Sequence, residues 1–156
     1  MPDPEIRPAR PDEAAAMTAL MRRSKQHWGY DAAFMEAHAG SLTITREDIE
    51  RWGSFVLVLG GTLIGLLHLE AGSEPEVMVL TDLFIDPAFI GKGNGTRLWN
   101  YACGVARERG FRVLTFDSDP NAVGFYLHLG AIQIGVTRST VIPGRVLPAM
   151  RFDLVD

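Results

Sequence analysis

Apolar residues along the chain follow two different periods, and the changes between them mark the predicted elements. Spacings of three and four positions predict one amphipathic helix with Asp12 and Glu13 in its first turn, and another that follows residue 95 and ends at Gly110. Residues 54–71 instead hold two apolar runs separated by a Gly-Gly pair, which is typical of two strands in a hairpin. Shorter runs predict strands at residues 5–10, 76–87, 111–119, 131–140 and 149–156, and Pro143, Gly144 and Pro148 are expected in the loop between the last two. Short helices are predicted at residues 31–40, 45–52 and 121–130, with Thr45 as a cap of the second and with Asp117 and Asp119 shaping the turn before the third.

These elements follow the order β-ααα-βββ-α-β-α-ββ, which predicts an α+β fold around one mixed sheet. The 156 residues fit a single domain spanning residues 1–156, and no repeat or low-complexity tract interrupts them. Contents of 47% hydrophobic and 22% charged residues are ordinary for a soluble globular protein. Composition alone therefore leaves the function open.

Charge and cysteine content exclude several classes of protein. A net charge of −4 offers no basic excess to neutralise the phosphates of a nucleic acid. The longest apolar runs are too short to cross a bilayer, and the first ten residues do not resemble a signal peptide. Cys103, the single cysteine, lies near the apolar stripe of the helix that follows residue 95 and is expected in the core. His38 and His128 lack ligand spacing with other metal-binding residues. We therefore expect a cytoplasmic protein without nucleic-acid, membrane or metal partners.

The stretch DPAFIGKGNGTRLW, residues 86–99, is the main candidate for a binding site. Gly91, Gly93 and Gly95 lie between a predicted strand and a predicted helix, where backbone N–H groups and the helix dipole favour an anion, and Lys92 adds a positive charge. The sequence has no P-loop pattern, and the spacing G-x-G-x-G differs from a dinucleotide fingerprint. A phosphate site is the functional interpretation, and a merely tight turn is the alternative.

Two separate stretches resemble the GNAT N-acetyltransferases. LFIDPAFIGKGNGTRLW is similar to the family's acyl-CoA pyrophosphate loop, with Gly93 and Gly95 at its two small positions. DPNAVGFYLHLGA is similar to a later family segment, with Asn121, Tyr126 and Gly130 in register. The resemblance implies a central mixed, mostly antiparallel sheet of about seven strands flanked by helices, which agrees with the predicted element order.

The resemblance further implies transfer of an acetyl group from acetyl-CoA to the primary amine of a small molecule by direct attack. Ile90 occupies a position that is usually Gln or Arg in the family, so only its backbone can contact the cofactor. Either Lys92 or Arg97 could compensate for the missing side-chain contact, or the affinity for the cofactor could be lower. In the family, the strand before the loop splays from its neighbour and pairs with the pantetheine arm. The implied cofactor-binding residues are Leu83, Phe84, Ile85, Ile90, Gly91, Lys92, Gly93, Asn94, Gly95, Thr96, Asn121 and Tyr126.

Acyl transfer needs a group that protonates the leaving thiolate and a group that takes the proton from the amine. Tyr126, protonated at neutral pH, matches the family's general acid. Either Asp82 or Glu70 could serve as the base, although both could also be ordinary surface carboxylates. His68 is expected to be structural, and Asn121 could cap a helix, contact the cofactor, or do both.

The acceptor site is expected in the early helices and the late strands. His27, Trp28 and Tyr30 form a polar and aromatic cluster with Lys25 where the first helix ends, and Arg145 could bind a substrate carboxylate. Two other functions stay open, namely a non-catalytic acyl-CoA sensor and a protein or peptide N-acetyltransferase. The resemblance also leaves a homodimer open as the assembly.

Overall fold

The computed structural model describes residues 2–154. The chain forms two compact units, which we describe separately. Unit 1 comprises Met1–Leu69 and Asp82–Tyr101, and unit 2 comprises Glu70–Thr81 and Ala102–Asp156. The sequence-based division into a single domain stays a prediction.

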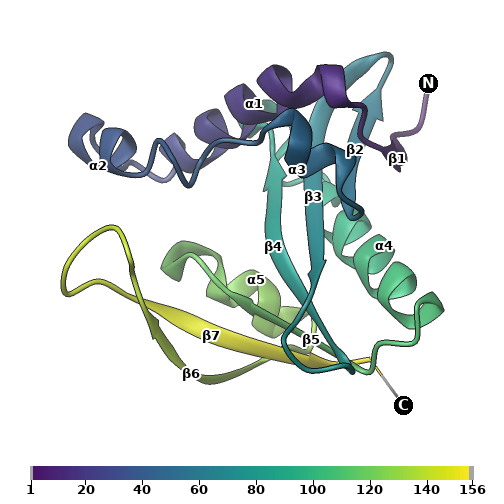
Figure 1. Ribbon diagram of the computed structural model, residues 1–156. Helices are drawn as coiled ribbons and strands as arrows, with labels where there is room; N and C mark the ends of the chain where they lie inside the picture. The colour runs from purple at the N-terminus through teal and green to yellow at the C-terminus, as the bar shows by residue number, and fades with distance from the viewer. Residues whose placement is uncertain (1, 155–156) are drawn as a thin grey trace. The chain divides into compact units, whose positions relative to one another are not determined.

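Seven strands form one sheet in the order β1-β2-β3-β4-β5-β7-β6 (Figure 1). The pairs β1–β2, β2–β3, β5–β7 and β6–β7 are antiparallel, whereas β4 and β5 are parallel. The predicted α+β fold with a mixed, mostly antiparallel sheet is therefore confirmed. The elements are β1 (Glu5–Pro8), η1 (Pro11–Glu13), α1 (Ala14–Gln26), α2 (Ala32–Ala37), α3 (Arg46–Glu50), β2 (Ser54–Leu59), β3 (Thr62–Ala71), β4 (Val77–Ile85), η2 (Pro87–Phe89), α4 (Asn94–Glu108), β5 (Val113–Asp117), η3 (Pro120–Ala122), α5 (Val123–His128), β6 (Ile132–Arg138) and β7 (Val146–Asp153).

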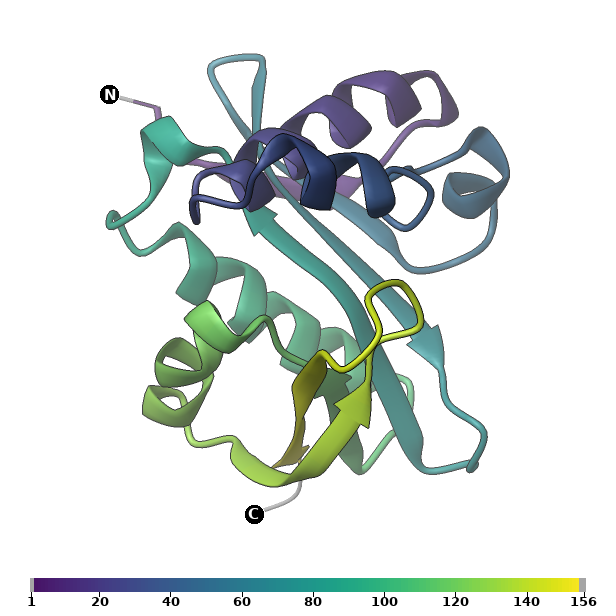
Figure 2. The ribbon, with the colours of Figure 1, turned by 90° about the vertical axis from the view of Figure 1, so that its left-hand side faces the viewer.

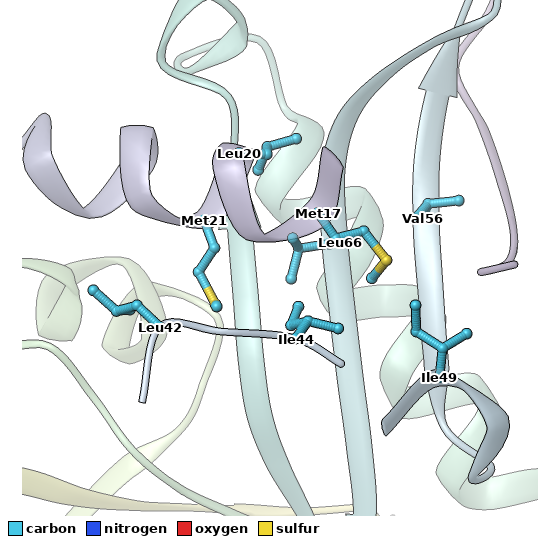
Figure 3. Close-up of a cluster of buried hydrophobic side chains, with 8 residues drawn as sticks. All are labelled: Met17, Leu20, Met21, Leu42, Ile44, Ile49, Val56 and Leu66. Carbon is cyan, nitrogen blue, oxygen red and sulfur yellow. The ribbon is translucent and has the colours of Figure 1, made fainter. Parts of the chain in front are cut away.

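An apolar cluster fixes α1 in unit 1. Met17, Leu20 and Met21 recur at helical spacing on α1 and are at most 1% exposed. They pack with Val56 of β2 and Leu66 of β3, and Figure 3 also shows the residues that close the cluster from the α2–α3 connection and from α3. Burying side chains of this size contributes about 2 kcal/mol each. The cluster therefore holds α1 in place, including its last turn, which follows Met21.

Two local predictions in unit 1 are confirmed in detail. Gly60 and Gly61, with φ of +56° and +84°, form the β2–β3 hairpin turn that needs left-handed backbone at both positions. Thr45 caps α3 by accepting a hydrogen bond from the Asp48 N–H group, while the Asp48 carboxylate accepts one from Thr45 N–H. Both features depend on residues close together in the chain.

Gly65 of β3 has no side chain, which lets β4 and α4 approach β3 closely. A Cβ added at Gly65 would lie 3.0 Å from Ile85 Cδ1 and 3.2 Å from Leu98 Cδ1. Ile85 ends β4, and Leu98 lies in the first turns of α4. The absence of a side chain at Gly65 therefore allows β4 and α4 to pack on β3. These two elements flank the loop that contains Gly91 and Gly93, which we call the glycine loop.

In unit 2, β7 lies between β5 and β6, and Figure 1 shows α5 beside these strands. The predicted last strand, 149–156, begins too late, because β7 starts at Val146. Pro148 was expected in the connecting loop but lies within the strand, since its carbonyl still accepts a hydrogen bond from Ser118 N–H at 2.9 Å. Residues 155–156 of the predicted strand lie outside the described residues. Within residues 2–154, no helix has both the length and the apolar character that a membrane span requires.

Candidate functional site

The turn before the glycine loop is fixed at both ends. Asp86 N–H donates to the Ile64 carbonyl at 2.8 Å, and the Asp86 carboxylate accepts from Ala88 N–H at 3.0 Å. At the other end, the buried side chain of Asn94 donates from Nδ2 to the Phe89 carbonyl at 3.1 Å. Asn94 was predicted to contact a cofactor, and in this structure its side chain shapes the loop.

Two of the three glycines adopt backbone that other residues avoid. Gly91 and Gly93 have φ of +81° and +80°, whereas Gly95 lies within α4. A Cβ added at Gly91 or Gly93 would meet no atom within 4 Å, so these positions require glycine for its left-handed backbone and not for space. Alternation of left- and right-handed residues turns successive N–H groups outward and creates an anion-binding concavity.

Helix α4 begins directly after this loop (Figure 2, teal). Arg97 N–H donates to the Gly93 carbonyl at 3.1 Å, which is the first helical hydrogen bond. The N–H groups of residues 94–96 precede it, and the first turn of any helix leaves such groups without helical partners. Because α4 has 15 residues, its dipole also places partial positive charge at this end.

The two side chains that flank Gly91 differ in chemistry. Lys92 is exposed, with Nζ 5.6 Å from the centre of the Phe89 ring. Ile90 is 44% exposed, carries no polar group, and its N–H lies 3.4 Å from the Pro87 carbonyl. The loop therefore has one mobile cation and no polar side chain at residue 90.

The strand that leads into the loop carries the residues expected to bind the pantetheine arm. Pairing of β4 with β5 covers only residues 77–79 and 113–115, so the expected splay of these two strands is confirmed. Further along β4, Asp82, Leu83 and Phe84 are half-buried, and Ile85 is buried. Asp82 is in unit 1, whereas the other candidate base, Glu70, is exposed on β3 in unit 2.

An ion pair without any signal in the sequence pattern joins α1 to the turn before the loop. Arg23 Nη2 lies 2.8 Å from Asp86 Oδ2. Burial raises the pKa of Asp86, but hydrogen bonds from Arg23 and from Ala88 N–H outweigh that effect, and the pKa lies below its ordinary value. The two residues are 63 positions apart, so only the fold brings them together.

The cluster predicted at the end of α1 is partly an aromatic stack in unit 1. The Tyr30 and Phe34 rings lie 3.9 Å apart at 8°, and the ring of the buried His38 lies 4.0 Å from Phe34. Lys25 Nζ sits 5.3 Å from the centre of the Tyr30 ring. Since this cation is already near the aromatic face, Tyr30 has an evident structural role.

His27 and Trp28 lie outside this stack, immediately after α1. Trp28 is 45% exposed. The centroids of the His27 and Trp28 rings lie 6.1 Å apart in an edge-to-face arrangement. These two residues thus present an aromatic and titratable surface to solvent.

In unit 2, Tyr126 is 7% exposed and packs against the Phe116 ring at 4.5 Å between centroids. Its helix follows a turn that Asp119 caps, since the Asp119 carboxylate accepts from both the backbone and the side-chain nitrogen of Asn121, at 2.8 and 2.9 Å. Of the two roles expected for Asn121, the helix cap is wrong, because Asp119 is the N-cap of η3 and Ala122 is the N-cap of α5, whereas its contact with the cofactor stays a prediction.

Arg145 belongs to the same unit and lies in the β6–β7 loop. Its side chain is only 17% exposed, and Nη2 lies 3.9 Å from Asp119 Oδ2. The structure therefore brings Arg145 and the Asn121 turn together through Asp119, a residue that the sequence indicated only as part of the turn.

Two other singled-out side chains, His68 and Cys103, are buried. His68 Nδ1 lies 2.6 Å from Ser54 Oγ between β3 and β2, a contact consistent with its expected structural role. Burial raises the pKa of the Cys103 thiol to about 11, which agrees with the core position expected for it. In the part of the chain that the structure covers, no three His, Cys, Asp or Glu side chains gather closely enough to hold a metal ion.

Comparison with known proteins settles the family. The model of the acetyltransferase (GNAT) family matches residues 14–131, which include the glycine loop and the Tyr126 helix. This chain belongs to the GNAT family. The family assignment made from the two sequence stretches is therefore confirmed.

Several GNAT relatives are similar in sequence or fold. An uncharacterized N-acetyltransferase of Methanocaldococcus jannaschii is 31% identical over 86 residues, which is 50% of this chain and 38% of that protein. A GCN5-related N-acetyltransferase from Rhodopseudomonas palustris has a TM-score of 0.76 at 22% identity, covering 98% of both chains. The PaiA N-acetyltransferase from Thermoplasma acidophilum, solved with coenzyme A, has a TM-score of 0.75 at 19% identity, covering 97% of this chain and 99% of that one. At these identities, the structural likeness concerns the fold.

Proposed function

We propose that this protein transfers the acetyl group of acetyl-CoA to the primary amine of a small molecule by direct attack. The observation that carries the proposal is the left-handed backbone at Gly91 and Gly93 immediately before α4, in a chain of the GNAT family. The coenzyme A bound to the Thermoplasma relative supports the choice of acyl carrier.

The loop fits the diphosphate of coenzyme A. The left-handed backbone at Gly91 and Gly93, the N-terminal end of the α4 dipole and the exposed Lys92 all favour an anion with several oxygens. Ile90 is the weakest of the proposed contacts, because its side chain has no donor and its N–H is directed to Pro87 at 3.4 Å. Acetyl-CoA, when bound, supplies a thioester whose carbonyl an amine can attack.

Tyr126 is proposed to donate a proton to the departing thiolate. An ordinary phenol is protonated at neutral pH, as that role requires. Packing of Tyr126 on Phe116 restricts the ring to a defined orientation, which supports a positioned acid.

Asp82 and Glu70 remain the proposed bases for the acceptor ammonium. Asp82 is half-buried whereas Glu70 is exposed, and a shielded carboxylate is the more effective proton acceptor. The proposal therefore places Asp82 first. Its test is the turnover of Asp82→Asn and Glu70→Gln: the first should be slowed much more than the second.

The proposed acceptor contacts are His27 and Trp28, which are exposed, together with Tyr30 and Arg145. The guanidinium of Arg145 is largely shielded from solvent, which favours an acceptor carrying a carboxylate beside its amine. A peptide acceptor is the competing substrate class.

The test is the release of free thiol from acetyl-CoA, followed with a chromogenic disulfide, against a panel of amines, amino acids and short peptides. The proposal predicts release that depends on a small amine, with mass spectrometry showing its acetylated product. Release only with peptides would assign the protein to peptide acetylation. Saturable acetyl-CoA binding without release would favour the sensor, the function that the apolar Ile90 keeps open.

A further inference from the structure

The carboxylate of Asp86 is the junction of three segments of unit 1. Its Oδ1 accepts the N–H group of Ala88 at 3.0 Å, and its Oδ2 accepts the guanidinium of Arg23 at 2.8 Å. The backbone N–H of Asp86 holds the Ile64 carbonyl of β3 at 2.8 Å. One residue thereby ties β3, the turn before the glycine loop, and the last turn of α1.

Hydrogen bonds carry this anchorage from Asp86 to the start of α4. Phe89 N–H donates to the Asp86 carbonyl at 2.8 Å, and the Phe89 carbonyl accepts from Asn94 Nδ2 at 3.1 Å. Gly91 and Gly93 lie between these two fixed points. The orientation of the loop N–H groups therefore depends on where Asp86 is held.

Arg23 is attached to a rigid element but is not itself part of the core. The α1 residues Met17, Leu20 and Met21 are buried, whereas the Arg23 side chain is 53% exposed. An exposed ion pair contributes little to the stability of the whole fold. Removing it should consequently release the loop while leaving the packing of α1 intact.

We propose that Arg23 is a positioning residue for acyl-CoA binding, acting through Asp86 on the glycine loop. This inference rests on the proposed function, since it assumes that the loop holds the coenzyme diphosphate. The chain of α1 continues from Arg23 into Lys25, His27 and Trp28, so the same contact links the proposed acceptor segment to the cofactor loop.

A purely electrostatic effect of Arg23 and Asp86 on coenzyme A and an effect on the orientation of the loop predict different results. Coenzyme A is an anion, so removing the positive charge of Arg23 would weaken its binding, whereas removing the negative charge of Asp86 would strengthen it. If the pair orients the loop, Arg23→Gln and Asp86→Asn both weaken binding. Asparagine retains an oxygen that can accept from Ala88 N–H, so Asp86→Asn preserves the local cap.

The experiment is calorimetric titration of coenzyme A, which measures binding without turnover, into the wild type and its variants. Each of the two substitutions should raise Kd about three- to fivefold, a range that follows from the strength of exposed ion pairs. The double variant should bind coenzyme A no more weakly than either single variant, because both substitutions remove the same ion pair. Arg23→Lys should recover part of the affinity, and the KM for acetyl-CoA should change more than kcat.

Arg151→Gln is the matched control, since it removes another exposed pair, Arg151 with Asp153 at 3.0 Å, in β7. It should leave Kd unchanged. Tighter binding by Asp86→Asn, an unchanged Kd in Arg23→Gln, or an equal effect of Arg151→Gln would overturn the inference while the proposed function stands. A wild type that does not bind coenzyme A would overturn both.

Discussion

Replacing Glu13 by glutamine tests how much the ion pair between Arg7 and Glu13, near the N-terminus, contributes to the free energy of unfolding. Arg7 donates to both carboxylate oxygens of Glu13, each at 2.8 Å. The carboxylate also accepts from Arg10 N–H at 2.8 Å, and Glu13 is only 8% exposed. These contacts, chiefly the hydrogen bonds from Arg7, lower the pKa of Glu13 from 4.5 to about 2.

That pKa change gives the magnitude of the effect. One unit corresponds to about 1.4 kcal/mol, so the ionised Glu13 contributes at most about 3 kcal/mol to the free energy of unfolding. Because the folded-state pKa is the lower one, the contribution is complete above the unfolded pKa and is lost as pH falls from about 4.5 through about 2. Glutamine keeps one acceptor oxygen, so we expect Glu13→Gln to cost about 2 kcal/mol at pH 7.

The assay is urea unfolding of the wild type and Glu13→Gln at a series of pH values from 7 to 3. The stability difference should be largest near neutral pH and should begin to shrink below pH 4.5. Glu50→Gln, at an exposed position of α3, is the control and should stay within about 0.5 kcal/mol of the wild type. Equal stabilities at pH 7, or a difference that does not change with pH, would show that the ionised Glu13 does not stabilise the fold.

Three further predictions concern the site and its surroundings. Tyr126→Phe should lower kcat at least about tenfold without changing the Kd of coenzyme A, and unchanged turnover would remove its role as acid. Gly93→Ala and Gly60→Ala both place a side chain at positive φ in open space, so each should cost about 1 kcal/mol of stability, but only Gly93→Ala should weaken coenzyme A binding. Cys103, whose pKa burial raises to about 11, should react with iodoacetamide only after unfolding, and rapid labelling of the folded protein would contradict its core position.

Features that depend on neighbouring residues could be predicted from the sequence. The turn at Gly60 and Gly61 follows from backbone freedom, and the cap at Thr45 follows from a side chain three residues before its partner. Gly93 in the loop was recognised for the same reason, since few other residues adopt its backbone conformation. In each case, the physical cause lies within a few positions of the residue.

Features that depend on distant contacts could not be predicted. Arg23 and Asp86 are 63 positions apart, and neither has a pattern that indicates the other. Pro148 was placed in a loop because proline interrupts most strands, yet here its carbonyl finds a partner in Ser118. Asp119 was expected to shape a turn, but its proximity to Arg145 depends on how the β6–β7 loop folds back.

Binding of the acyl-CoA diphosphate by the backbone of the glycine loop can be observed by NMR titration of the 15N-labelled protein with coenzyme A. We expect saturable shifts that are largest at the backbone amides of Gly91 to Thr96. Binding that leaves these amides unshifted, or no binding at millimolar coenzyme A, would contradict this binding mode.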